Sequence, residues 1–223
     1  MIEFLKGDLV KKIIFKCQSV TSLKMYGANK VLELRPTSFK GIMRFWWRAM
    51  NGEKSLEQLR KTEEKIFGSL NKKSTFNILI PKYELKGSII NEGFEFDIKI
   101  IQNGCFDIKS FFELVVILGL FGQKGKGKIK TQGAIKIIEI DNNKYNQKID
   151  ISYIYELLKK FSKFSNCYII KNNKIIFNDK NNDKKQEYPV VSEIEIKNKD
   201  LLITLGNSKI KTIKKNLKAY NNE

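Results

Sequence analysis

One stretch near the N-terminus, Leu34–Met50, organises the interpretation of the whole chain. It reads LRPTSFKGIMRFWWRAM. Proline is disfavoured inside helices, so Pro36 is expected outside the helix, with Thr37 or Ser38 as its N-cap. From that cap the spacing of apolar residues predicts a helix to about Met50, where the sequence NGEK interrupts it.

The predicted helix has two faces. Its apolar residues fall mainly on one side, as a core face requires; they are Phe39, Ile42, Met43, Trp46 and Met50. Lys40, Arg44 and Arg48 are spaced i, i+4, i+8 and share another side, with Trp47 beside them. We expect Trp46 in the core, whereas Trp47 is open between the core and a surface on which a base stacks.

The start of this helix is suited to an anion. Arg35 and Lys40 flank it, where free backbone N–H groups and the helix dipole favour negative charge. The arginine fork also matches phosphate geometry. The sequence therefore predicts a phosphate-binding ridge; its candidate residues are Arg35, Ser38, Lys40, Arg44, Trp47 and Arg48. The alternative is a solvated charged face over core tryptophans.

The elements around this helix predict an α+β fold. A β-branched strand is expected over 11–23, a second helix from a Ser55 cap to Gly68, and two or three strands within 74–90 and 92–101. A buried helix over 108–122 and a strand over 133–140 follow. This order is that of a ferredoxin-like (RRM-like) antiparallel sheet with helices on one face, and it assigns residues 1–142 to one domain.

Beyond residue 142 the composition shifts to lysine and asparagine. A helix near 152–164 and strands near 168–177, 190–196 and 201–205 predict a smaller, degenerate ferredoxin-like α+β unit over 143–223.

Glycine alternates with lysine in the stretch 122–130, GQKGKGKIK. A P-loop is excluded because Ile129 stands where a hydroxyl must hold magnesium, and because the helix precedes the loop instead of following it. The dinucleotide fingerprint fails at Lys130. A cationic loop facing a nucleic-acid backbone remains, with a merely solvated loop as the alternative. Its candidate residues are Gly122, Lys124, Gly125, Lys126, Gly127, Lys128 and Lys130.

The charge of the chain favours polyanions. Among 223 residues, 42 lysines and arginines oppose 24 acids, for a net charge of +18 and a pI of about 9.7. Nucleic acid and an anionic membrane face are the partners such a field attracts. An A/T-rich genome, which encodes lysine and asparagine freely, would account for the total but not for the position of the arginines, since three of the four lie within Arg35–Arg48.

Several classes of site are not expected. Histidine is absent, and Cys17, Cys105 and Cys167 are far apart, so neither a zinc site nor a disulfide framework is predicted. We expect no metal and no cofactor. The apolar run 111–121 is too short to span a bilayer, and the N-terminus lacks a signal-peptide pattern. We therefore expect a cytoplasmic protein.

Three motifs together resemble the RAMP superfamily of CRISPR proteins, and within it most closely the first subunit of type III-B (Cmr) effector complexes. They are Arg35–Arg48, then Ile66-Phe67-Gly68-Ser69, then the glycine-rich stretch Gly119–Gly133. The last departs from the usual arginine-rich form, and the C-terminal third shows little match.

This resemblance implies a ferredoxin-like fold and a non-catalytic role near the 3′ end of a guide RNA. The implied partners are guide RNA, target RNA and other Cmr subunits, and no membrane. A backbone-binding role agrees with the lysine-rich loop, which gives affinity without base readout.

Two other functions remain open from sequence. A metal-independent RAMP-type endoribonuclease would need Tyr26 or a lysine such as Lys24 as proton shuttle, because histidine is absent. A metal-dependent one would need clustered acids, and the loop at 24–30 contains none. A basic module that docks only on protein partners is the other alternative.

Overall fold

The computed structural model describes residues 10–27, 30–51, 55–122, 129–162, 167–177, 190–206 and 212–221. Its first sheet has five strands, in the order β2-β3-β1-β5-β6, and every pairing in it is antiparallel. The strands are β1 (Lys11–Ser19), β2 (Phe76–Leu79), β3 (Glu95–Gln102), β5 (Ile135–Ile140) and β6 (Asn143–Lys144). The helices between them are α1 (Pro36–Met50), α2 (Leu56–Phe67) and α3 (Ile108–Leu118).

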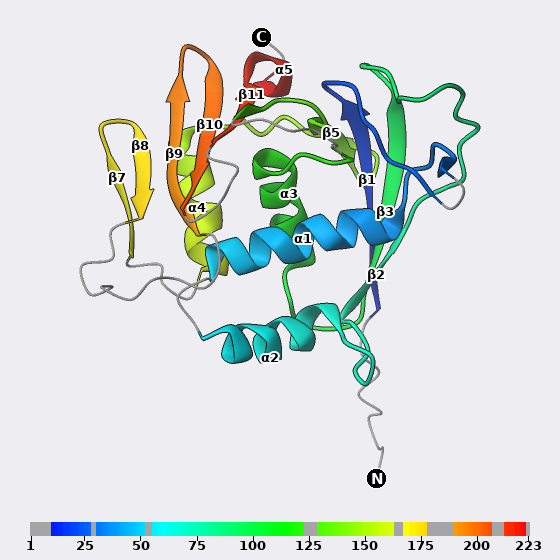
Figure 1. Ribbon diagram of the computed structural model, residues 1–223, viewed down its shortest axis with the longest axis horizontal. Helices are drawn as coiled ribbons and strands as arrows, with labels where there is room; N and C mark the ends of the chain where they lie inside the picture. Colours follow the sequence, from blue (N-terminus) through cyan, green and yellow to red (C-terminus); the bar gives the residue numbers. More distant parts are fainter. Residues whose placement is uncertain are drawn as a thin grey trace.

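The ferredoxin-like prediction is confirmed by this topology. The four main strands lie in the order β5-β1-β3-β2, and α1 and α3 connect them as the two crossover helices. Alternate residues of β1 point into the core, namely Ile13, Phe15 and Cys17. Figure 1 shows α1 and α3 on the same side of this sheet, with α2 below α1.

The helix ends follow two different rules. At α2 the expectation is confirmed: the Ser55 side chain accepts a hydrogen bond from the Gln58 N–H, and Gly68 is the C-cap. At α1 the expected cap is wrong, because the helix begins at Pro36 and Arg35 is the N-cap without a side-chain hydrogen bond. Proline suits the first helical position, where the N–H it lacks would have no intrahelical partner.

The second sheet has six strands in the order β4-β11-β10-β9-β8-β7. They are β4 (Ile129–Lys130), β7 (Tyr168–Lys171), β8 (Lys174–Phe177), β9 (Val191–Lys197), β10 (Asp200–Leu205) and β11 (Thr212–Asn216). From β7 to β11 it is an antiparallel meander, whereas β4 pairs parallel to β11. Two helices accompany it, α4 (Ile151–Phe161) and α5 (Lys218–Asn221).

Each sheet contains one short strand from the other side of residue 142, the predicted domain boundary. β4 precedes residue 142 yet pairs in the second sheet, and β6 follows residue 142 yet pairs in the first. The strands β4, β6 and β11 and the helix α5 were not predicted. The division of the chain into two domains at residue 142 stays a prediction.

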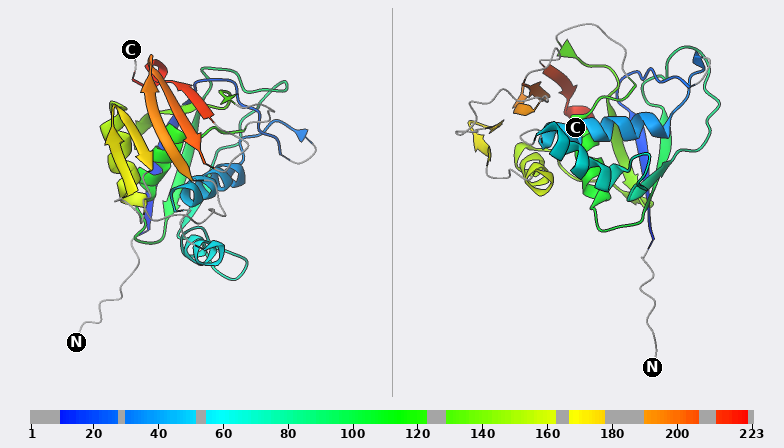
Figure 2. Two further views of the ribbon diagram at one scale, coloured as in Figure 1. Left: turned by 60° about the vertical axis from the view of Figure 1, so that its left-hand side comes forward. Right: turned by 60° about the horizontal axis from the view of Figure 1, so that its bottom comes forward.

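Helix α3 lies between the two sheets and is buried along nearly its whole length. From β11, the Lys215 ammonium donates to the carbonyl oxygens of Val116 and Ile117, at 2.7 and 2.8 Å, near the C-terminal end of α3. Figure 2 (left) brings the second sheet forward and shows it beside α3 and α4. None of the helices in the described ranges is long and apolar enough to cross a membrane.

Candidate nucleic-acid interface

The core face of α1 is largely as predicted. Phe39, Met43, Trp46 and Met50 are buried, while Ile42 is half-buried. Trp47 is only 3% exposed, and its ring meets that of Phe67 edge-on. Trp47, which the sequence left open between core and stacking surface, therefore belongs to the core, and its place among the binding candidates is corrected: α2 covers the side of α1 from which Trp47 projects.

The arginines of α1 share one buried carboxylate that the sequence analysis missed. Glu63 of α2 is 2% exposed and accepts from Arg44 Nη1 at 2.7 Å and from Arg48 Nη2 at 2.8 Å. Arg48 Nε donates to its other oxygen, so the Arg48 contact is bidentate. The two arginine side chains are about one-third exposed, at 31% and 33%. The expected open ridge is thus partly neutralised.

A sequence signal for this pairing exists. Leu59, Glu63 and Phe67 are spaced i, i+4, i+8, and all three are buried. A carboxylate on the apolar face of a helix requires a cation opposite, because burying an unpaired charge is costly. That position predicts an ion pair with whichever helix α2 packs against.

Arg44 also fastens the first motif to the second. Its Nη2 donates to the carbonyl oxygens of Phe67 and Gly68, at 3.0 and 2.7 Å. Gly68 has φ = 76°, and a Cβ there would lie 2.6 Å from the Lys72 carbonyl oxygen and 2.7 Å from the Ser74 nitrogen. Only glycine fits this tight turn. The motif Ile66–Ser69 is therefore a turn held against α1 by Arg44.

An open polar pocket of about 400 Å³ lies at this junction. Lysine, arginine, serine and asparagine dominate its lining, which contains no carboxylate; it consists of Lys40, Arg44, Phe67, Gly68, Ser69, Lys72, Lys73, Ser74, Asn77 and Asn103. We call it the α1–α2 pocket. Cations with hydroxyl and amide donors, and no competing acid, suit an anion such as phosphate.

Lys40 is half-buried where it lines this pocket. Burial, together with the neighbouring Arg44 charge, lowers its pKa below the ordinary lysine value. Its ammonium lies 5.1 Å from the centre of the Phe76 ring. Within the described part of the chain, no carboxylate pairs with Lys40, Lys72 or Lys73. An anion bound here would relieve the unfavourable concentration of positive charge.

Of the other candidates on α1, Arg35 and Ser38 are half-buried. Arg35 Nη1 donates to the Tyr26 carbonyl oxygen at 3.4 Å, so its side chain is directed at the loop after β1. Ser38 lies in the first turn of α1, where its N–H donates to the Arg35 carbonyl oxygen.

Glycines of the third motif lie at the two ends of the glycine-lysine loop, where the backbone packs closely against its neighbours. A Cβ on Gly119 would lie 2.9 Å from Trp46 Nε1, and one on Gly133 would lie 2.2 Å from the Phe121 carbonyl oxygen. Gly122 has φ = 62°, and its carbonyl oxygen accepts from the Lys24 N–H at 2.8 Å. The loop therefore begins and ends against α1 and the segment after β1.

The loop itself is not among the described residues. Lys124, Gly125, Lys126, Gly127 and Lys128 lie outside them, and Lys130 is described only as part of the backbone of β4. The base of the loop contacts Ile42 and Trp46, whereas the α1–α2 pocket lies on the Lys40 and Arg44 side. The loop base and the pocket thus lie on different sides of α1.

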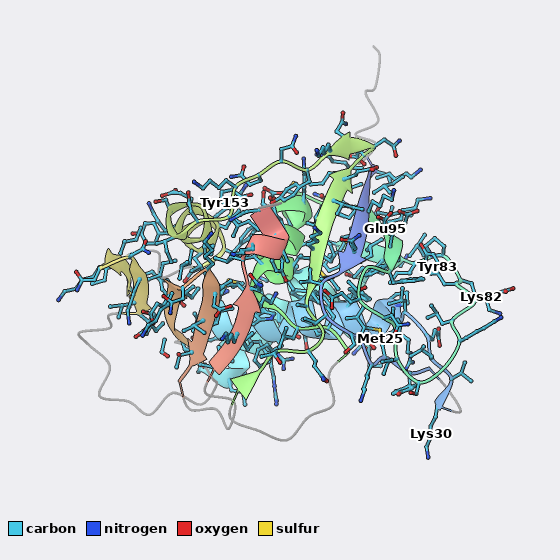
Figure 3. The ribbon with its side chains drawn as sticks, turned by 90° about the horizontal axis from the view of Figure 1, so that it is seen from above. Met25, Lys30, Lys82, Tyr83, Glu95 and Tyr153 are labelled. Atoms are coloured by element: carbon cyan, nitrogen blue, oxygen red, sulfur yellow. The ribbon has the colours of Figure 1, made fainter. Side chains whose placement is uncertain are left out.

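Of the residues suggested for a nuclease, Tyr26 already uses its hydroxyl: Tyr26 Oη donates to the Ser88 carbonyl oxygen at 2.5 Å. Lys24 donates its backbone N–H to the Gly122 carbonyl oxygen, a bond that does not involve its side-chain amine. No cluster of three or more cysteines and acids arranged to bind a metal occurs among the residues with described positions. In Figure 3, Met25 and Lys30 of this region lie across the molecule from Tyr153.

The fold is that of an α+β protein in which α1 holds a glycine turn on one side, through Arg44 and Gly68, and lies against Gly119 of the glycine-rich motif on another. The sequence profile of the RAMP superfamily matches residues 19–208, and the chain belongs to that superfamily.

A CRISPR system Cmr subunit of Pyrococcus furiosus, Cmr1-2, is 29% identical over 157 residues, which are 68% of this chain and 72% of the relative. The crystal structure of Cmr1 from Pyrococcus furiosus in its apo form superposes with a TM-score of 0.51 at 18% identity, which shows the shared fold. That superposition covers 70% of this chain and 59% of the crystallised one, so this chain matches less than two-thirds of it.

Proposed function

We propose that this chain is a non-catalytic RNA-binding subunit of a type III-B CRISPR (Cmr) effector complex. In this role it holds guide RNA near its 3′ end and contributes to the capture of target RNA, beside other Cmr subunits. The observation that carries the proposal is the α1–α2 pocket, because four cations line it and no carboxylate does. The similarity to a Cmr subunit supports the choice of complex.

The chemistry of the pocket suits the backbone of a strand. A guide of arbitrary sequence has to be held by its phosphates and sugars, which carry no sequence information. Lys40, Lys72 and Lys73 supply charge, while Ser69 and Asn77 supply hydrogen bonds to phosphate or ribose oxygens. Such contacts bind RNA with little sequence preference and with strong salt dependence.

The path of the RNA strand over the protein follows from the positions of the pocket and of the loop base on two different sides of α1. At 100° per residue, Ser38, Gly41 and Phe45 occupy the arc between the pocket side and the loop side. Gly41 is exposed, and a Cβ there would have no neighbour within 4 Å. No packing in the described structure requires glycine at this helical position. An RNA strand that passes from the pocket to the base of the glycine-lysine loop crosses α1 over Gly41, where it approaches the helix backbone closely.

The test is the salt dependence of binding to a labelled single-stranded RNA of arbitrary sequence. Each phosphate contact contributes about 0.7 to the slope of log K against log salt. Replacement of Lys72 and Lys73 by alanine should lower that slope by about 1.4 in total. Replacement of Lys11 and Lys12, on exposed positions of β1, is the matched control. An unchanged slope in the pocket variant would remove the pocket from the RNA site.

The alternative is a RAMP-type endoribonuclease that processes CRISPR RNA. Purified protein incubated with labelled repeat RNA, with and without magnesium, separates the two functions. Site-specific cleavage that Tyr26→Phe abolishes would contradict the non-catalytic role. Intact RNA at stoichiometric protein supports it.

A further inference from the structure

A second pocket, remote in sequence from the first, lies where α3, the β5–β6 hairpin and α4 meet. It has a volume of about 490 Å³. Polar groups dominate its lining: Lys109, Ser110, Glu113, Asp141, Asn143, Lys144, Tyr145, Asn146, Gln147 and Tyr153, with Ile140. We call it the Glu113 pocket, because this residue is its most deeply buried polar group.

Glu113 is a buried carboxylate without a cationic partner. It is 6% exposed, and no lysine or arginine in the described ranges forms an ion pair with it. The phenol hydroxyls of Tyr145 and Tyr153 both donate to its Oε1. Tyr153, labelled in Figure 3, belongs to α4, and its hydrogen bond joins α4 to Glu113 of α3. A buried carboxylate normally requires a cation or a full set of hydrogen-bond donors.

The two tyrosines are fixed as donors. Burial, reinforced by Glu113, raises the pKa of both phenols above the usual tyrosine value, so each keeps its proton at neutral pH. Oε1 has therefore filled its two lone pairs. Oε2 accepts no hydrogen bond from any residue whose position is described, so Glu113, which lines the pocket, keeps one oxygen that can accept from a ligand.

The rest of the pocket suits an anionic molecule that carries such a donor. Lys109 and Lys144 line it, and neither forms an ion pair within the described structure. Asp141 also lines it, and its Oδ1 accepts from the Ile14 N–H at 2.8 Å; its single negative charge is outweighed by the two lysines. A nucleotide combines a negatively charged phosphate with a flat base whose edge carries N–H donors.

We propose that the Glu113 pocket binds a nucleotide whose base has an exocyclic amino group, with that amino group donating to Glu113 Oε2 and the phosphate near Lys109 and Lys144. A carboxylate accepts well from an amino group such as N4 of cytosine. Uracil presents a carbonyl oxygen at the same place, which the carboxylate repels. The pocket would thus read a base, which goes beyond the backbone contacts of the proposed function.

The experiment compares nucleotide pairs that differ by this group. Isothermal titration of the full chain with cytidine and uridine 5′-monophosphates should show cytidine binding about tenfold more tightly. Guanosine should exceed inosine 5′-monophosphate in the same way, since inosine lacks only the amino group. Equal affinity within either pair would overturn the proposal. Competition by spermidine, which has amino groups but neither a base nor a phosphate, would also overturn the proposal if it displaced cytidine monophosphate, because the site would then be one for amines.

Two variants locate the contacts. Glu113→Gln keeps an acceptor for the tyrosines but presents an amide N–H₂ to the base, so the preference for cytidine over uridine should be lost or inverted. Lys109→Ala, on a side chain at the pocket rim, should weaken both nucleotides equally and leave their ratio intact. Because Lys109→Ala does not alter the buried Glu113 cluster, it tests the site even if Glu113→Gln fails to fold. Unchanged affinity in Lys109→Ala would refute the assigned phosphate position.

Discussion

Removal of the arginines that share Glu63 should destabilise the fold in a non-additive way. The single changes are Arg44→Ala and Arg48→Ala, and the double change removes both. Each single variant leaves Glu63 one arginine, whereas the double variant leaves a carboxylate that is 2% exposed with neither of its arginine partners. An unpaired buried charge costs far more than a weakened pair.

The contacts set the expected sizes. Arg44 loses its bond to Glu63 and two bonds to the carbonyl oxygens of Phe67 and Gly68. Charge-assisted hydrogen bonds contribute about 1.5–3 kcal/mol each when buried. The side chain is about one-third exposed, so water recovers part of this, and we expect a loss of about 3 kcal/mol. Arg48 contacts Glu63 bidentately, and we expect its removal to cost about 2 kcal/mol.

The assay is urea unfolding followed by circular dichroism, with melting temperature as a second measure. For a chain of this length, 3 kcal/mol lowers the melting temperature by roughly 6–12 °C. The double variant should lose at least about 1 kcal/mol more than the sum of the single variants. Lys61→Ala is the matched control, because its ion pair with Glu57 lies exposed on the same helix α2 and is expected to contribute less than about 0.5 kcal/mol.

Two results would refute this reasoning. Strict additivity of the two arginine changes would mean that Glu63 finds other compensation when both are gone. An Arg44 variant as stable as the Lys61 control would mean that the turn at Gly68 does not depend on the arginine.

Other changes test neighbouring features. Gly41→Ala should raise the free energy of unfolding by about 0.5–1 kcal/mol, because the position is helical and unobstructed. Gly41→Gln should fold normally yet weaken RNA binding. Unchanged binding would reject the proposed path of the RNA over α1. Gly68→Ala should lower the melting temperature by several degrees, owing to its positive φ and the contact with Lys72. Burial lowers the pKa of Lys215 well below its ordinary value, so unfolding takes up protons in the window between that lowered pKa and about 10.5. Stability should therefore rise with pH across this window, and Lys215→Met should flatten the dependence.

Local pattern was sufficient for much of the first sheet. Each expected element between 11 and 140 exists, since period-two alternation and helical periodicity report directly on which face is buried. The Ser55 cap and the Gly68 stop were predictable because both act on backbone groups within a few residues. Trp46 was correctly assigned to the core for the same reason.

Local sequence pattern did not predict the contacts between elements that are far apart in the chain. The strands β4 and β11 pair in parallel although they are far apart in the chain, and two residues of β4 carry too little pattern to predict a strand. Trp47 was undecided because its exposure depends on where α2 packs, and helical spacing in α1 does not fix that.

By itself, the sequence determined the ferredoxin-like order of elements, the basic character of the chain and the three motifs that place it in its superfamily. The tertiary structure alone decided which of those charges are available. It pairs Arg44 and Arg48 with a carboxylate from another helix, and it adds Lys72 and Lys73 to the pocket beside Lys40. The physical reason is that the energy of a charge depends on its neighbours in space, and neighbours from different elements meet only when the helices pack.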